Sequence, residues 1–117
     1  MPTIRDLVAA IRQRDGVEAA VVLGHDGLVI DGQALAGMDT EHIAAHVPAL
    51  VSAARSFADI AARGELTTAV LEYAHGMAVV SVLSPDAVLL VLLQFGANLG
   101  QLLFELRRNR EHIAALV

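Results

Sequence analysis

The run AVLLVLLQF at residues 87–95 constrains the fold of this chain more than any other segment. A β-strand points successive side chains to opposite faces of its sheet, so this run is apolar on both faces. A strand without a polar face has to be covered on both sides. The run therefore predicts the central strand of a sheet that carries helices on each face.

Four further strand-like runs supply the rest of the predicted sheet. Residues 16–32 contain two apolar runs joined at Asp26-Gly27, and glycine supplies the positive φ that a tight hairpin turn needs. Runs at 66–73 and 77–83 precede the central run, and the links between them are too short for parallel crossovers. The hairpin is expected on the free side of the central run, which gives five antiparallel strands.

A long helix is predicted between the hairpin and the run at 66–73. It starts at residue 39 or 40, ends near residue 63, and should kink or break ahead of the interior Pro48. Its predicted core face consists of Ile43, Val47, Leu50, Ala54, Phe57, Ala58 and Ala61.

Helical periodicity also predicts a helix at each end of the chain. Residues 4–14 are amphipathic, and Thr3 with Asp6 has the spacing of a capping box. Asn98 and Gln101 have the same spacing at the start of the last helix. The order α-β-β-α-β-β-β-α predicts an α/β fold, a three-layer α/β/α sandwich around a five-stranded antiparallel sheet. The terminal helices are expected on one face and the long helix on the other.

The composition limits where such a chain works. Hydrophobic residues make up 56% of the 117 residues, yet the longest apolar run, 87–93, is far shorter than the roughly 20 residues of a membrane span. Arginines interrupt the first apolar stretch, which argues against a signal peptide. We expect a single domain over residues 1–117 that is cytoplasmic and not inserted in a membrane. The apolar excess indicates an oligomer or an obligate partner.

The charges and reactive side chains argue against several classes of function. The net charge of −5 disfavours nucleic acid binding. The chain has no cysteine for thiol chemistry, and its serines show no pattern of a histidine–acid triad. His42 and His46 have a metal-chelating spacing, but Glu41, the one further ligand nearby, points elsewhere. We expect no enzyme, no metal and no cofactor.

Three segments together resemble the Roadblock / dynein light chain family, in particular its bacterial MglB-type members. They are the hairpin GVEAAVVLGHDGLVI, the alanine-rich helix at 41–62 and the closing NLGQLLFELRRNREHIAAL. The resemblance implies non-catalytic homodimers of the Roadblock/profilin-like fold that bind Ras-like small GTPases and modulate nucleotide turnover. The chain is shorter than the gliding-motility members and lacks their C-terminal tail, so direct stimulation of GTP hydrolysis or exchange is not implied.

One stripe of the long helix favours pairing with a second helix. The stripe combines small side chains with two imidazoles, although alanine also occurs simply because it favours helix. If the imidazoles met their copies across a twofold axis, protonation at about pH 6 would bring positive charges together and weaken the dimer. The stripe consists of His42, His46, Ala49, Ala53 and Ile60.

The run at 66–73 is a second candidate for the dimer contact. It lies at one end of the meander and has no interior proline or lysine, which commonly protect edge strands. The other edge, LVIDG, is short and ends in Asp31-Gly32, which is poorly suited to pairing. The predicted contact residues on one face of the run are Leu66, Thr68, Val70 and Glu72.

The opposite side of the long helix is the candidate surface for a partner. Taken alone it is an ordinary solvated helix face, but the resemblance implies that GTPases dock on the paired long helices. The candidate residues are Pro48, Ser52, Arg55 and Asp59. Two alternatives stay open: a structural dimerisation module in a larger complex without a GTPase, and a small-ligand sensor. The aromatic content of 3% argues against the sensor.

Overall fold

The computed structural model describes residues 2–117 as one sheet with helices on both faces. In chain order the elements are α1 (Ile4–Arg12), β1 (Val17–Gly24), β2 (Val29–Ala34), α2 (Thr40–Ala45), α3 (Val47–Ile60), β3 (Thr68–Tyr73), β4 (Gly76–Ser84), β5 (Ala87–Leu93), α4 (Leu99–Arg108) and α5 (Arg110–Ala114).

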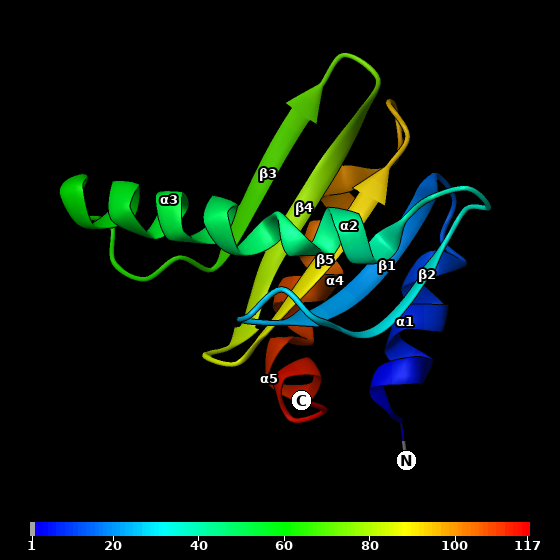
Figure 1. Ribbon diagram of the computed structural model, residues 1–117, viewed down its shortest axis with the longest axis horizontal. Helices are drawn as coiled ribbons and strands as arrows, with labels where there is room; N and C mark the ends of the chain where they lie inside the picture. Colours follow the sequence, from blue (N-terminus) through cyan, green and yellow to red (C-terminus); the bar gives the residue numbers. More distant parts are fainter. Residues whose placement is uncertain (1) are drawn as a thin grey trace.

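The sheet lies between two helical layers (Figure 1). Its strand order is β2-β1-β5-β4-β3, and all neighbouring strands are antiparallel. Helices α2 and α3 cross one face, while α1, α4 and α5 cover the other. The predicted three-layer sandwich is confirmed, as is the place of the hairpin beside the central strand.

Strand β5 contributes side chains to two separate cores. Leu89 and Val91 pack in the core under α1, α4 and α5, whereas Val88 and Leu90 pack in the core under α2 and α3. All four side chains are at most 5% exposed. The strand therefore has no face that could tolerate water, as the apolar run predicts.

The predicted long helix is two helices. Helix α2 ends at Ala45 and α3 begins at Val47, which places Pro48 in the first turn of α3. The N–H that proline lacks has no helical partner in a first turn, so Pro48 is tolerated there. The break predicted ahead of Pro48 is confirmed.

The far end of α3 differs from the prediction. Ala62 has a φ of 55°, and the Arg63 N–H donates to the Ala58 carbonyl oxygen at 2.9 Å. This is a Schellman ending, in which a left-handed residue turns the chain out of the helix. The helix therefore stops at Ile60 and not near residue 63.

Part of the predicted core face of the long helix is wrong. Phe57 is 72% exposed, Ala61 is also exposed, and only the first half of α3 is buried, through Val47 and Val51. Figure 1 shows the reason, because the second half of α3 projects past the edge strand β3 and has no sheet beneath it. Ile60, at the tip of this projection, is 85% exposed.

Strand β2 is longer than predicted. The predicted hairpin spans residues 16–32, but β1 is long enough to pair with Gln33 through Ala20 and with Ala34 through Ala19. The two edge strands, β2 and β3, consequently have the same length of six residues. Strand length therefore does not distinguish one edge from the other.

The terminal helices are shorter than predicted. The capping box of Thr3 and Asp6 is present, but α1 ends at Arg12. The last helix is interrupted at Asn109, whose side-chain Nδ2 donates to the Glu105 carbonyl oxygen at 2.9 Å. An asparagine that bonds the backbone of the preceding turn competes with continuation of the helix.

Replacing Ala62 with glycine should stabilise the protein. A left-handed conformation costs a residue with a Cβ atom about 1–2 kcal/mol, which glycine avoids, so the free energy of unfolding should rise by about 1 kcal/mol. Urea unfolding followed by circular dichroism measures the change. Gly64→Ala is the matched control, since Gly64 has a φ of 80° with open space around it. In this variant the free energy of unfolding should fall by a similar amount. Equal stability of the wild type and Ala62→Gly would contradict this account.

Candidate protein interaction site

The four residues predicted to bind a partner line one side of a groove. Pro48, Ser52, Arg55 and Asp59 recur every three or four residues along α3, so they share one face of the helix. The cavity beside them measures about 340 Å³ and is closed on the far side by His25 and Pro85. His25 belongs to the β1–β2 turn and Pro85 to the β4–β5 turn.

A second cavity of about 310 Å³ extends this groove toward β3. It shares Arg55, Asp59 and Pro85 with the first cavity and adds Glu65 and Leu66 from the α3–β3 loop. The two cavities form one continuous depression between α3 and three loops. We call it the α3 groove, lined by Pro48, Ser52, Arg55 and Asp59 on the helix and by His25, Pro85, Glu65 and Leu66 on the loops.

Backbone contacts hold the loop side of the α3 groove in place. The His25 N–H donates to the Asp86 carbonyl oxygen at 3.1 Å, which ties the two turns together. Gly27 has a φ of 86°, and a Cβ atom there would lie 3.2 Å from Pro48 Cγ. The turn therefore sits directly against the start of α3, as only glycine allows.

The α3 groove has several polar side chains in its lining. Ser52, Ser56, His25 and Asp59 all line it, but no hydrogen bond joins their side chains in the part of the chain that the structure describes. A serine nucleophile would need such a bond to a base. Across residues 2–117, no three histidine or acidic side chains gather as a metal-ligand set. None of the helices in that range is both long and apolar enough to span a bilayer.

The edge strand β3 offers unused backbone hydrogen-bonding groups. The Val82 N–H donates to the Thr67 carbonyl oxygen at 2.9 Å, and the register pairs Ala69 with Val80. Because bonded pairs alternate along an antiparallel ladder, the residues between them point their N–H and C=O groups away from β4. These are Thr68, Val70 and Glu72. Leu66, the fourth residue predicted for this edge, precedes the strand and lines the α3 groove instead.

The other edge strand, β2, protects one of its free donors. The Leu35 N–H donates to the Glu18 carbonyl oxygen at 3.0 Å, so the same alternation leaves Gly32 pointing outward. The Gly32 N–H donates instead to Asp31 Oδ1 at 2.9 Å. The two edges thus differ in their free backbone donors, because Asp31 accepts one on β2. They do not differ in length, contrary to the expectation of a short second edge.

The predicted helical stripe is not gathered in one place. His42 lies on α2, which packs over β1 and β2, and His46 directly follows α2; their ring centroids are 5.0 Å apart. His46 Nδ1 lies 3.0 Å from the His42 carbonyl oxygen. Ile60 is the last residue of α3, whose far end lies past β3 at the opposite end of this helical layer (Figure 1). All five residues of the stripe, with Ala49 and Ala53, are exposed.

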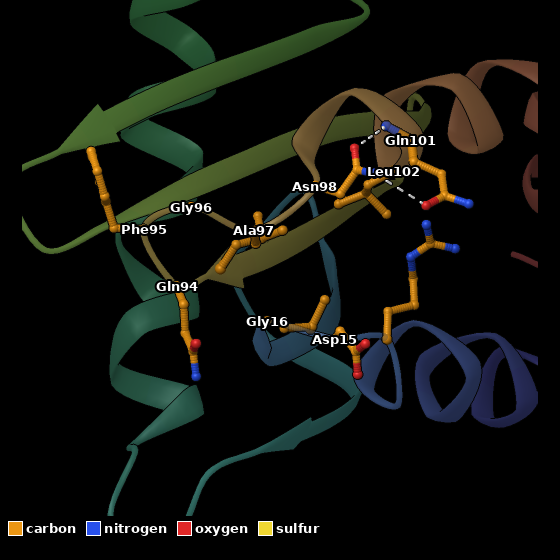
Figure 2. A pocket seen from close by; sticks show the side chains of 12 residues that line it. Asp15, Gly16, Gln94, Phe95, Gly96, Ala97, Asn98, Gln101 and Leu102 are labelled. Carbon is orange, nitrogen blue, oxygen red and sulfur yellow. Dashed lines mark hydrogen bonds between the residues drawn. The ribbon is translucent and has the colours of Figure 1, made fainter.

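A separate cavity of about 580 Å³ lies at the end of the molecule where β5 leads into α4 (Figure 2). The α1–β1 loop and the β5–α4 loop form it, and Gln94, Asn98 and Gln101 give it a polar lining. Asn98 Oδ1 accepts from the Gln101 N–H at 3.0 Å as the helix cap. None of the predicted site residues lies there.

Comparison with known proteins places this chain among sequences of one family. The sequence model of the Roadblock/LC7 domain matches residues 3–93. An uncharacterized protein of Methanocaldococcus jannaschii is 30% identical over 106 residues, which cover 91% of this chain and 92% of that protein. A second uncharacterized protein of that organism is 32% identical over 107 residues, covering 91% and 89%.

Solved structures share the fold. A Roadblock/LC7 domain from Streptomyces avermitilis superposes with a TM-score of 0.83 at 25% identity, over 96% of this chain and 95% of that one. MglB of Myxococcus xanthus superposes with a TM-score of 0.86 at 15% identity, over 97% of this chain and 93% of that one. At this lower identity the likeness concerns the fold alone.

Proposed function

Because this chain belongs to the Roadblock/LC7 family, we propose that it is a non-catalytic homodimeric adaptor that binds a Ras-like small GTPase. The α3 groove is the proposed docking site, and binding there modulates the nucleotide cycle or the location of the GTPase. The observation that supports this most is the convergence of Pro48, Ser52, Arg55 and Asp59 on one groove. A concave surface with an apolar floor and a few polar groups suits a protein partner better than a flat helix face does.

The free edge of β3 supports the homodimer. Thr68, Val70 and Glu72 have outward N–H and C=O groups, and a second β3 in antiparallel orientation would satisfy them. A register with Val70 opposite its own copy pairs Thr68 with Glu72 of the partner subunit and obeys twofold symmetry. The two sheets would then form one continuous sheet.

The projecting half of α3 supports the same arrangement. A twofold axis between two antiparallel edge strands is perpendicular to the sheet, so both α3 helices lie on one side and run antiparallel. Each projection would extend over the partner's sheet, next to the face that carries Leu71 and Tyr73. Phe57 and Ile60 would be buried there, which accounts for large apolar side chains at 72% and 85% exposure.

This dimer keeps the imidazoles apart. His42 and His46 lie over β1 and β2, on the side of the sheet away from β3. They do not meet their copies, so the weakening at acid pH that a histidine seam would cause is not part of the proposal. Ala53 and Ile60 are the residues of the stripe nearest the proposed axis.

Val70→Pro should convert the dimer into a monomer. Proline lacks the outward N–H at the centre of the proposed pairing, while the bonds to β4 come from the neighbouring residues and are retained. Light scattering at micromolar concentration measures the mass, and circular dichroism checks the fold. Ala34→Pro makes the matching change at the other edge and should leave a dimer. Phe57→Asp, at an exposed position, should also dissociate the dimer. A monomeric wild type would refute the arrangement. Dimers from both Val70→Pro and Phe57→Asp would refute it as well.

Ser52→Trp should abolish GTPase binding. The exposed serine lies beside the 340 Å³ cavity, so an indole there fills the space that the partner needs. The experiment is a pull-down against Ras-like GTPases loaded with a GTP analogue or GDP, with retention expected for one nucleotide state. Ala36→Trp, in the exposed loop after β2, is the control that keeps binding. No retention of any GTPase would favour the structural dimerisation module without a GTPase.

A further inference from the structure

The floor of the α3 groove is apolar and belongs to the protein core. Leu23, Val47, Val51 and Val88 line the 340 Å³ cavity, and each side chain is at most 6% exposed. All four belong to the core under α2 and α3, so the floor is rigid. A cavity of this size and lining accepts one large apolar side chain of a partner as an anchor.

The rim of the α3 groove is acidic. Asp59 on α3 and Glu65 in the following loop line it directly. Asp26 and Asp86 are adjacent in sequence to the lining residues His25 and Pro85, at the two turns that the His25–Asp86 backbone bond joins. Arg55 belongs to the lining, and Arg63 directly precedes the lining residue Gly64, so four carboxylates and two arginines lie in or next to the lining.

These charges have no ion-pair partner within the molecule. Among residues 2–117 the only ion pair is between Arg14 and Glu105, on the opposite helical layer. Residues 15–54, which supply the β1–β2 turn and the first half of α3, contain six acidic residues and no arginine or lysine. The rim therefore has an excess of negative charge, and no ion pair among residues 2–117 involves its carboxylates.

We propose that the occupant of the α3 groove is a partner segment with one large apolar side chain flanked by lysine or arginine. The apolar side chain inserts over Val51 and Val88, and the cations lie against Asp59, Glu65 and Asp86. This inference rests on the proposed function for the location of the site and adds the chemistry of the segment that enters it. The segment contributes specificity and association rate through charge, and affinity through the anchor.

Selection of a random peptide library displayed on phage, against the immobilised protein, tests this chemistry. Peptides that combine an aromatic or aliphatic residue with neighbouring lysine or arginine should be enriched over the input library. Their binding should be lost in Ser52→Trp and kept in Ala36→Trp. A consensus that is acidic or without charge bias, enrichment that survives Ser52→Trp, or no enrichment would overturn the proposal.

Fluorescence anisotropy with an enriched peptide then tests the rim. The double variant Asp59→Asn, Asp86→Asn should weaken binding about three- to tenfold, as expected for two exposed charge pairs. Neither carboxylate bonds the backbone in this structure, so both variants should fold. The control Asp15→Asn, Glu111→Gln removes two exposed carboxylates outside the groove and the proposed dimer contact, and it should bind unchanged. Equal weakening by both double variants would overturn the role of the rim.

The salt dependence separates the contributions of rim and floor. Raising the salt concentration from about 50 mM to about 500 mM should weaken the wild type and should affect Asp59→Asn, Asp86→Asn less. A salt response that is identical in the two proteins would overturn the charge assignment. GTPase retention that is lost in Ser52→Trp, in a protein that selects no basic peptide, would refute this chemistry and leave the proposed function standing. If basic peptides are selected but no GTPase is retained, the peptide chemistry stands and the proposed function is refuted.

Discussion

The burial of β5 on both faces is the constraint on which the rest of the structure depends. Val88 and Leu90 need one helical layer, and Leu89 and Val91 need another. Once both faces are covered, the surfaces left for other molecules are the two sheet edges and the outer sides of the helices. Among residues 2–117 the sheet remains exposed at β3, where Tyr73 is 59% exposed, so an extensive contact has to use this edge strand, a helix or the loops at a strand end.

Much of the fold was predictable because its signals are local. The alternation that marks strands, the short links of the meander and the proline at residue 48 each act within a few neighbouring residues. The position of Phe57 was not predictable in this way. Its spacing along α3 is that of a core residue, and its exposure arises because the sheet ends at β3 before the helix does. Periodicity gives the face of a helix but not the extent of what lies beneath it.

The candidate site was predictable only in half. Pro48, Ser52, Arg55 and Asp59 share a helix face, so their spacing in the sequence already places them together. The opposite side consists of His25, Pro85 and Glu65 from three different loops, which come together through the strand order β2-β1-β5-β4. No periodicity relates such residues, and they have no common motif. Similarly, the protection of β2 by Asp31 depends on a side-chain bond that composition does not reveal.

The α3 groove and the proposed dimer contact share the second half of α3. Arg55 and Asp59 face the groove, whereas Phe57 and Ile60 of the same two turns face away from the described chain. Within one protomer the sheet does not extend beneath the end of this half, since it ends at β3. If the β3 edges pair as proposed, the partner's sheet supplies that support. Ordering of these turns then depends on the dimer, so the part of the groove formed by Arg55 and Asp59 would be less well formed in a monomer.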